Sequence, residues 1–233
     1  MMAALTTLGF DADDTLWHNE RVFRLTEDRF ADLLSNYSDK SRLSERLLAA
    51  ERRNVLHYGY GVKGFTLSMI ETAIEVTDGK VSADVIAEIL AAGRDMLSHP
   101  VAPLPYVEDT LKAVKDDYRL VLITKGDLFD QERKVSASGL DVYFDAIEIV
   151  SEKNAGTYHT LFARHGTGAR EAMMIGNSLK SDILPALEAG AQAAHVPYEI
   201  TWALEEADTP DETERYFRLD HIGKVPQLLA RLS

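Results

Sequence analysis

Four short segments of this sequence carry side chains that together could transfer a phosphoryl group. Asp11 and Asp13 are separated by one residue, and Thr124, Lys153 and Asp182 follow at wide intervals. A carboxylate can attack phosphorus, and a second carboxyl can move a proton to and from oxygen. A hydroxyl and an ammonium can neutralise charge on the phosphoryl oxygens. These residue types therefore indicate a reaction on a phosphate ester, provided that the fold brings them together.

Each of these residues lies at or just beyond the end of a predicted β-strand. Short apolar or β-rich runs predict strands at 5–10, 119–124, 146–151, 172–176, 193–196 and 217–222. Helical patterns lie between and after them, at 107–114, 131–138, 157–165, 181–189 and 224–232. Alternating strands and helices predict an α/β fold with a doubly wound, Rossmann-like parallel sheet. Ligands of such sheets bind beyond the carboxyl ends of the strands, so the candidate residues should share one rim.

The segment after the first strand has a different character. Between residues 19 and 99 four helices are expected, at 19–36, 41–57, 66–77 and 83–98, and no strand. We therefore predict a core of residues 1–18 and 100–233 with an inserted all-helical cap at 19–99. A loop punctuated by glycines is expected between Tyr58 and Phe65.

Composition limits the kind of partner. The formal net charge of −13 argues against general binding to nucleic acid or to anionic membranes. The absence of cysteine excludes disulfides and thiolate metal sites. The sequence contains no run of about 18 apolar residues, so no membrane span is predicted. No signal-like segment precedes the first strand. A cytoplasmic location is the expectation.

The strand-end motifs resemble those of the haloacid dehalogenase-like hydrolase superfamily. The first motif of that family, Asp-x-Asp-x-Thr/Val after an apolar strand, is matched by Phe10-Asp11-Ala12-Asp13-Asp14-Thr15-Leu16. The second is matched by Leu120-Val121-Leu122-Ile123-Thr124 and the third by Lys153. The fourth, Gly-Asp followed by another acid, is matched in part by Gly176-Asn177-Ser178-Leu179-Lys180-Ser181-Asp182. The resemblance covers nearly the whole chain.

This resemblance implies a catalytic role for each of four residues. Asp11 would attack phosphorus and form an aspartyl-phosphate. Asp13 would protonate the leaving oxygen and then take a proton from the hydrolytic water. Thr124 would donate its hydroxyl to a phosphate oxygen. Lys153 would neutralise both the phosphate and Asp11.

The resemblance also implies a magnesium site, because Mg²⁺ prefers oxygen ligands. The expected ligands are the Asp11 carboxylate, the backbone carbonyl of Asp13, and the acid of the fourth motif. Here Asn177 replaces the usual aspartate. An amide oxygen can bind Mg²⁺ but brings no charge, so Asp182 would supply the second carboxylate directly or through water.

Substrate contacts are expected from two places. Around Thr124 and Lys153, the backbone amides of Lys125 and Gly126 would add donors to the phosphate. In the predicted cap, Tyr60 and Lys63 are the best candidates to reach the leaving group. Together these expectations predict a magnesium-dependent hydrolase of a small phosphorylated metabolite.

Two other kinds of function stay open at this point, beside a phosphonate or sugar-phosphate mutase on the same fold. A 2-haloacid dehalogenase would use the same nucleophile without metal; Asp13 argues against it, and Asn177 argues mildly for it. A regulator that keeps the fold and binds phosphate without catalysis is the second. A dinucleotide-binding dehydrogenase is excluded, because no G-x-G-x-x-G follows the first strand.

Overall fold

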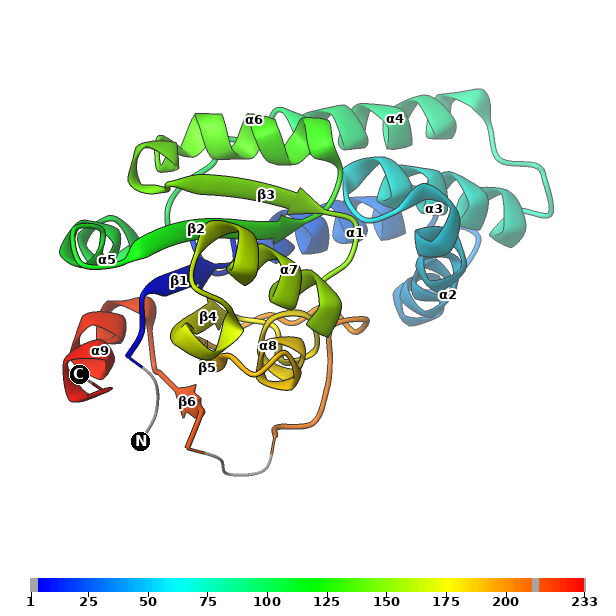
Figure 1. Ribbon diagram of the computed structural model, residues 1–233. Helices are drawn as coiled ribbons and strands as arrows, with labels where there is room; N and C mark the ends of the chain where they lie inside the picture. The colour runs from blue at the N-terminus through cyan, green and yellow to red at the C-terminus, as the bar shows by residue number, and fades with distance from the viewer. Residues whose placement is uncertain (1–3, 211–213, 233) are drawn as a thin grey trace. The chain divides into compact units, whose positions relative to one another are not determined.

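The computed structural model describes residues 4–210 and 214–232, and its centre is a parallel sheet (Figure 1). Within these residues the sheet has six strands in the order β3-β2-β1-β4-β5-β6, and every neighbouring pair is parallel. The strands are β1 (Thr7–Phe10), β2 (Arg119–Lys125), β3 (Ala146–Val150), β4 (Ala172–Gly176), β5 (Gln192–His195) and β6 (Tyr216–Arg218). The strand order reverses at β1, and this confirms the predicted doubly wound parallel sheet.

The sheet is covered on both faces. Alternate residues of a strand point to opposite faces, so in β2 Leu120 and Leu122 join one core and Val121 and Ile123 join the other. The first core packs against α5 (Val107–Val114), α6 (Leu128–Ser138) and α9 (Val225–Leu232). The second packs against α7 (Ala155–His165) and α8 (Leu184–Glu188). Burial on both faces is the reason that the central strands are continuous apolar runs.

Short helical turns complete the sheet region. They are η1 (Asp141–Tyr143), η2 (Ala169–Glu171), the π-helical turn η3 (Leu179–Ile183) and η4 (Ile222–Lys224). η3 and α8 together occupy the region where one helix is predicted at 181–189. The segment between β5 and β6 contains no helix or strand in its described residues, as expected from its acidic, irregular sequence.

The region between β1 and β2 carries four long helices with a core of their own. They are α1 (Glu20–Leu33), α2 (Lys40–Tyr58), α3 (Val62–Val76) and α4 (Ala83–Leu97). Their buried residues include Phe30, Leu47, Phe65, Met69 and Ile89. The side chain of Asp39 caps α2 and that of Ser82 caps α4, each by accepting a backbone N–H of the first turn.

The glycine-punctuated loop is shorter than predicted. α3 begins at Val62 rather than at residue 66, so Lys63 and Gly64 lie on its first turn. Gly61 has a φ of 104°, a conformation that favours glycine, and its carbonyl accepts the N–H of Phe65. The glycine at 61 therefore ends the loop and starts the helix.

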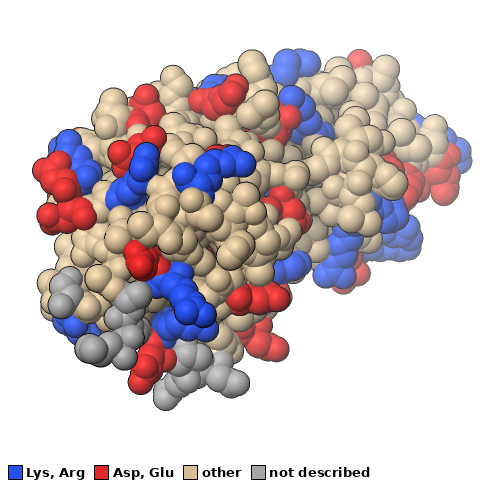
Figure 2. Space-filling view, in the orientation of Figure 1, with Lys and Arg blue, Asp and Glu red and all other residues tan. Residues whose placement is uncertain are grey.

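The chain divides into two compact units. One contains residues 1–20, 101–125 and 131–233 and is here called the sheet unit; the other contains residues 21–100 and 126–130 and is called the helical unit. The predicted division into a core and a cap as separate domains stays a prediction. Among the described residues no helix is both long and apolar enough to span a membrane. On the face shown in Figure 2, acidic and basic side chains are interspersed.

Candidate active site

Asp11 lies directly beyond β1, at the carboxyl edge of the sheet. Its backbone N–H donates to Ile175 of the neighbouring strand β4 at 2.9 Å, which continues the ladder by one residue. The Asp11 side chain is 9% exposed and has two side-chain donors. Lys153 Nζ lies 2.5 Å from Oδ1, and the Thr15 hydroxyl donates to Oδ2 at 2.8 Å. The carboxylate is therefore held in one orientation by residues from two different segments.

Lys153 is shared between two carboxylates. Its ammonium lies 2.7 Å from Asp182 Oδ1 as well as 2.5 Å from Asp11 Oδ1, and all three side chains are buried. The other Asp182 oxygen accepts the N–H of Ser178 at 2.9 Å. Gly176 is required beside it, because a Cβ at this position would overlap the Asp182 carboxylate. The structure thus brings together the ends of β1, β3 and β4.

The charges in this group do not balance. Two buried carboxylates face one ammonium, which leaves one excess negative charge in a poorly solvated place. Burial, with Asp182 adding to it, raises the pKa of Asp11 to about 7 despite the opposing effect of Lys153. Burial would lower the pKa of Lys153, but Asp11 and Asp182 outweigh it and raise that pKa. A cation or a proton is therefore favoured at Asp11.

Asp13 faces helix α6 rather than Lys153. Lys134 Nζ donates to both of its carboxylate oxygens, at 2.7 and 2.8 Å. Trp17 Nε1 donates to Oδ1 at 2.7 Å, and Gln131 Nε2 donates to Oδ2 at 3.2 Å. Both carboxylate oxygens of Asp13 therefore accept hydrogen bonds from neighbouring side chains in this arrangement.

Gln131 also orients Thr124. Its Nε2 lies 2.5 Å from Thr124 Oγ1, so the hydroxyl accepts one bond and keeps its own proton to donate elsewhere. Thr124 is 1% exposed at the end of β2. One α6 side chain therefore connects Thr124 with Asp13.

Two of the oxygens expected to bind Mg²⁺ lie beside Thr15. Its Oγ1 is 2.8 Å from Asp11 Oδ2 and 3.2 Å from Asn177 Oδ1, so the carboxylate and the amide are close to each other. Both Asp182 oxygens already accept from Lys153 and Ser178. This oxygen-only donor set fits Mg²⁺, with Asn177 better placed than Asp182 for direct contact. No group of three His, Cys, Asp or Glu side chains suited to a metal occurs among the residues that the structure describes.

Lys125 is engaged by acidic and hydroxyl groups. Its ammonium lies 2.7 Å from Glu205, 2.9 Å from Ser181 Oγ and 3.4 Å from Glu152. The side chain is therefore tied to the ends of β3 and β4 and to the segment after β5. Its predicted contact with substrate stays a prediction.

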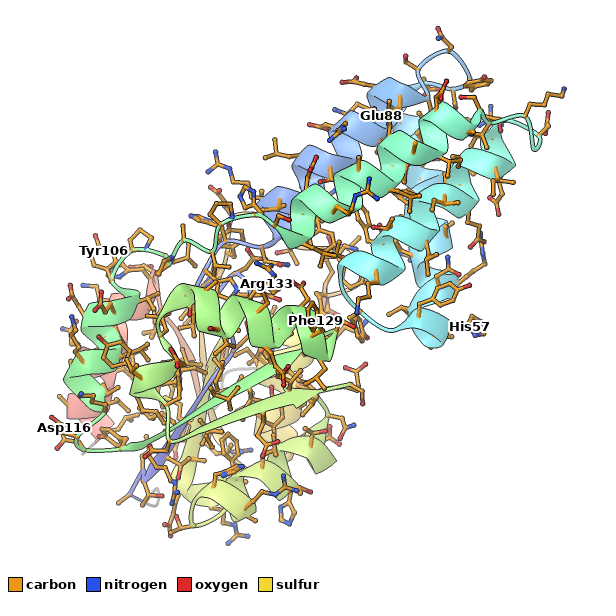
Figure 3. The ribbon with its side chains drawn as sticks, turned by 90° about the horizontal axis from the view of Figure 1, so that it is seen from above. His57, Glu88, Tyr106, Asp116, Phe129 and Arg133 are labelled. Carbon is orange, nitrogen blue, oxygen red and sulfur yellow. The ribbon has the colours of Figure 1, made fainter. Side chains whose placement is uncertain are left out.

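Tyr60, Lys63 and Gly126 belong to the helical unit, so their predicted contacts with substrate also stay predictions. Lys63 pairs with Asp127 at 2.9 Å, and its ammonium lies 5.7 Å from the centre of the Phe129 ring. Figure 3 marks Phe129 on the first turn of α6. Gly126 has a φ of 152°, which favours glycine directly after β2.

Sequence reasoning missed several residues that contact the candidate site. Gln131 and Lys134 are buried polar residues three apart on α6, and their spacing on one face of a predicted helix was the available signal. Thr15 belongs to the matched first motif, but no site role was predicted for it. Glu205 lies in an acidic, irregular segment, where nothing in the sequence distinguishes it from Glu206.

The doubly wound sheet, with Asp11 and Lys153 buried at its carboxyl edge, is an α/β fold that carries a candidate catalytic site. The family described as haloacid dehalogenase-like hydrolase matches residues 5–190, and the chain belongs to this family. A solved haloacid dehalogenase-like family hydrolase from Xanthomonas campestris is 40% identical, with a TM-score of 0.89. The match covers 98% of this chain and 96% of that one.

Two curated phosphatases match part of the chain. Glyceraldehyde 3-phosphate phosphatase of Methanothermobacter thermautotrophicus is 33% identical over 107 residues, 43% of this chain and 47% of that protein. N-acylneuraminate-9-phosphatase of Mus musculus is 32% identical over 92 residues, 37% of each. The matched segments span less than half of either phosphatase. A solved 2-haloacid dehalogenase from Pseudomonas syringae pv. Tomato DC3000 covers 98% of this chain and 100% of its own, with 19% identity and a TM-score of 0.64, and shares the fold.

Proposed function

We propose that this hydrolase is a magnesium-dependent phosphatase of a small phosphorylated metabolite, with Asp11 as the nucleophile. The observation that carries the proposal is the pairing of Asp11 with Lys153 beside Thr124 and Asp13 at one sheet edge. Phosphoryl transfer needs a second carboxyl to move protons, whereas attack on a haloacid carbon does not need one. The two partly matching phosphatases support the same reaction class.

In the first step an Asp11 oxygen attacks phosphorus and the bond to the leaving oxygen breaks. The negative charge on the phosphoryl oxygens is met by the Lys153 ammonium and the Thr124 hydroxyl. Asp13 gives its proton to the leaving oxygen, so Asp13 must gain a proton before this step. Because Lys134 and Gln131 donate to Asp13 in this arrangement, that proton accompanies a change in its hydrogen bonds.

In the second step water attacks the aspartyl-phosphate. Asp13, now a carboxylate, accepts a proton from that water, and the bond between phosphorus and the Asp11 oxygen breaks. Inorganic phosphate leaves and Asp11 returns to its carboxylate form. The same residue thus acts as acid and then as base.

Asp11, Asn177 and the carbonyl of Asp13 would hold the Mg²⁺, and when bound it would neutralise charge on the phosphate and at Asp11. The excess negative charge of the Asp11–Lys153–Asp182 group supports this part of the proposal. An amide in place of a carboxylate leaves the site with less charge to attract the ion.

The test is hydrolysis of p-nitrophenyl phosphate with Mg²⁺ and with excess chelator, by wild type and by Asp11→Asn. We expect turnover that requires Mg²⁺ and disappears in the variant. A screen of small phosphorylated metabolites would then identify the substrate. Chloride release from a 2-haloacid, unchanged by chelator, would show instead that the metal-free dehalogenase reading is right.

A non-catalytic regulator is distinguished in the same experiment. Such a protein would bind inorganic phosphate, as measured by calorimetry, and would hydrolyse no member of the metabolite screen. The contact of Asp11 with Lys153, and the link of Asp13 to Thr124 through Gln131, support catalysis over phosphate binding alone.

A further inference from the structure

Glu205 is a partly buried carboxylate to which no part of the proposed reaction assigns a role. Its side chain is only 16% exposed, although it lies in an irregular segment far from the motifs in sequence. The segment itself is fixed, because the Glu205 N–H donates to Trp202 at 2.8 Å and Lys180 Nζ donates to the Leu204 carbonyl at 2.5 Å. A charged group is rarely buried unless it is paired.

Three side chains around Glu205 donate hydrogen bonds to its carboxylate. The Ser178 hydroxyl donates to Oε2 at 2.6 Å, and the Ser181 hydroxyl donates to the same oxygen. Lys125 Nζ donates to Oε1 at 2.7 Å. Burial would raise the pKa of Glu205, but Lys125 and the two hydroxyls outweigh it and hold that pKa below its ordinary range. Glu205 is therefore an ionised acceptor with three protein donors.

The serines connect Glu205 with the centre of the site. Ser178 Oγ accepts the N–H of Ser181 at 2.9 Å, and Ser178 N–H donates to Asp182 at 2.9 Å. Asp182 in turn holds Lys153, which holds Asp11. A continuous chain of hydrogen bonds thus runs from Glu205 through the turn of residues 178–182 to the candidate nucleophile.

Glu205 is the nearer of two carboxylates that face the Lys125 ammonium, the other being the more exposed Glu152 at 3.4 Å. Lys125 is the residue after Thr124, and its ammonium bonds Ser181, the neighbour of Asp182 in sequence. An ammonium at that position would attract a phosphate dianion bound beside Thr124 and Lys153. Glu205 supplies an opposite charge 2.7 Å away, which cancels most of that attraction.

We propose that Glu205 is a positioning residue of this site. It holds the turn of residues 178–182 in place, and it balances the charge of Lys125 so that product phosphate is not bound too tightly. The kinetic part of this inference rests on the proposed phosphatase function, and the structural part does not.

The charge-balancing role is tested with Glu205→Gln, Lys125→Met and the double variant, with the exposed neighbour Glu206→Gln as matched control. Calorimetry with inorganic phosphate in Mg²⁺ gives the affinity, and p-nitrophenyl phosphate gives kcat and KM. In Glu205→Gln we expect phosphate to bind about three- to tenfold more tightly, KM to fall and kcat to fall about tenfold. The tighter binding should disappear in the double variant, and Glu206→Gln should resemble wild type.

A residue that only stabilised the fold would not make phosphate bind more tightly. Unchanged or weaker phosphate binding in Glu205→Gln would overturn charge balancing, as would tight binding that persists in the double variant. If wild type neither binds phosphate nor hydrolyses any ester, the proposed phosphatase function has failed, and the charge-balancing role fails with it.

The positioning role is tested separately by amide hydrogen exchange. The N–H groups of Asp182 and Ile183 both donate to the Ser178 carbonyl, so they report directly on the turn. We expect about tenfold faster exchange over residues 178–183 in Glu205→Gln than in Glu206→Gln, at equal thermal stability of the rest of the chain. Equal protection in the two variants would overturn the positioning role, whatever the enzymatic result.

Discussion

Charged side chains are used differently in the sheet unit and in the helical unit. In the candidate site Asp11, Lys153 and Asp182 are buried and share short ion pairs. In the helical unit Arg29 pairs with Glu88 at 2.8 Å and with Asp95 at 3.0 Å, but side-chain exposures run from 41% to 72%. The ion-pair distances are similar in the two units, but the exposure of the paired side chains to solvent differs.

The difference shows that geometry alone does not give the energy of an ion pair. An exposed pair exchanges good hydration for a contact that water and salt screen, so it contributes little. In a buried group each partner is indispensable, because its removal leaves a charge without water or counter-charge. Substitutions at the two places should therefore have very different effects.

The largest effect is expected for Lys153→Met. Removing this ammonium leaves Asp11 and Asp182 facing each other without a cation. We expect turnover to fall by at least about a thousandfold and the free energy of unfolding to fall by about 3–5 kcal/mol at neutral pH. Urea unfolding and phosphatase assays measure both, with the exposed Lys112→Met as control. Wild-type turnover in Lys153→Met would refute the role of this residue.

Asp11→Asn should abolish turnover and yet stabilise the metal-free protein. The pKa of Asp11 is about 7 in the fold against an ordinary value of 3.8, so between these pH values the folded state keeps a proton that the unfolded chain loses. The free energy of unfolding of wild type should therefore fall as pH rises through this range.

Asparagine cannot titrate, so the variant should lose this contribution. Its advantage over wild type should grow from near zero at pH 4 to about 2–4 kcal/mol at pH 8, in chelator. Burial also raises the pKa of Asp14 to about 7, and the Asp11 charge contributes to that rise, so Asp14 adds slightly to the difference in the same direction. A constant difference at all pH values would contradict the prediction.

Lys134→Met tests the surroundings of Asp13. Lys134 is the residue that donates to both Asp13 oxygens, so its loss should misplace the proposed acid. We expect hydrolysis of an alkyl phosphate to fall about 10- to 100-fold. Hydrolysis of p-nitrophenyl phosphate should fall much less, because nitrophenolate leaves without a proton. Arg133→Met on the same helix (Figure 3) is the control, and an equal loss on both substrates would count against the prediction.

Asn177→Asp adds a charge where the family usually has one. If the Asn177 oxygen contacts the ion, a carboxylate there should tighten Mg²⁺ binding about tenfold, as measured by calorimetry. Asn36→Asp, at an exposed position of the helical unit, introduces the same charge and serves as the control. Equal Mg²⁺ affinities in the two variants would place the ion away from Asn177.

The smallest effect is expected for Arg29→Ala. It breaks both ion pairs of the exposed cluster with Glu88, which Figure 3 labels, and Asp95. We expect the free energy of unfolding to change by less than about 1 kcal/mol. Thermal unfolding at low and high salt measures this change. A loss comparable with that of Lys153→Met would mean that burial is not what separates the two regions.

The sequence by itself determined the sheet and which residues stand at its carboxyl edge. The apolar run 120–123 is buried on both faces of the sheet, and runs of this kind alternating with helices predict a parallel sheet. In a parallel sheet all strands end at one edge, so Asp11, Thr124 and Lys153 could be placed together before any coordinates were known. The residue at which a helix begins was predicted less well, since α3 begins at Val62 rather than at residue 66.

Only the tertiary structure decided how the side chains pair. Three pairings depend on contacts between distant segments. Lys153 bridges Asp11 and Asp182, Asp13 pairs with Lys134, and Glu205 rather than Glu206 pairs with Lys125. A periodic pattern reports which face of an element is buried, because burial repeats along the chain. An ion pair between segments has no such repeat, and its partners are determined by burial and side-chain direction in three dimensions.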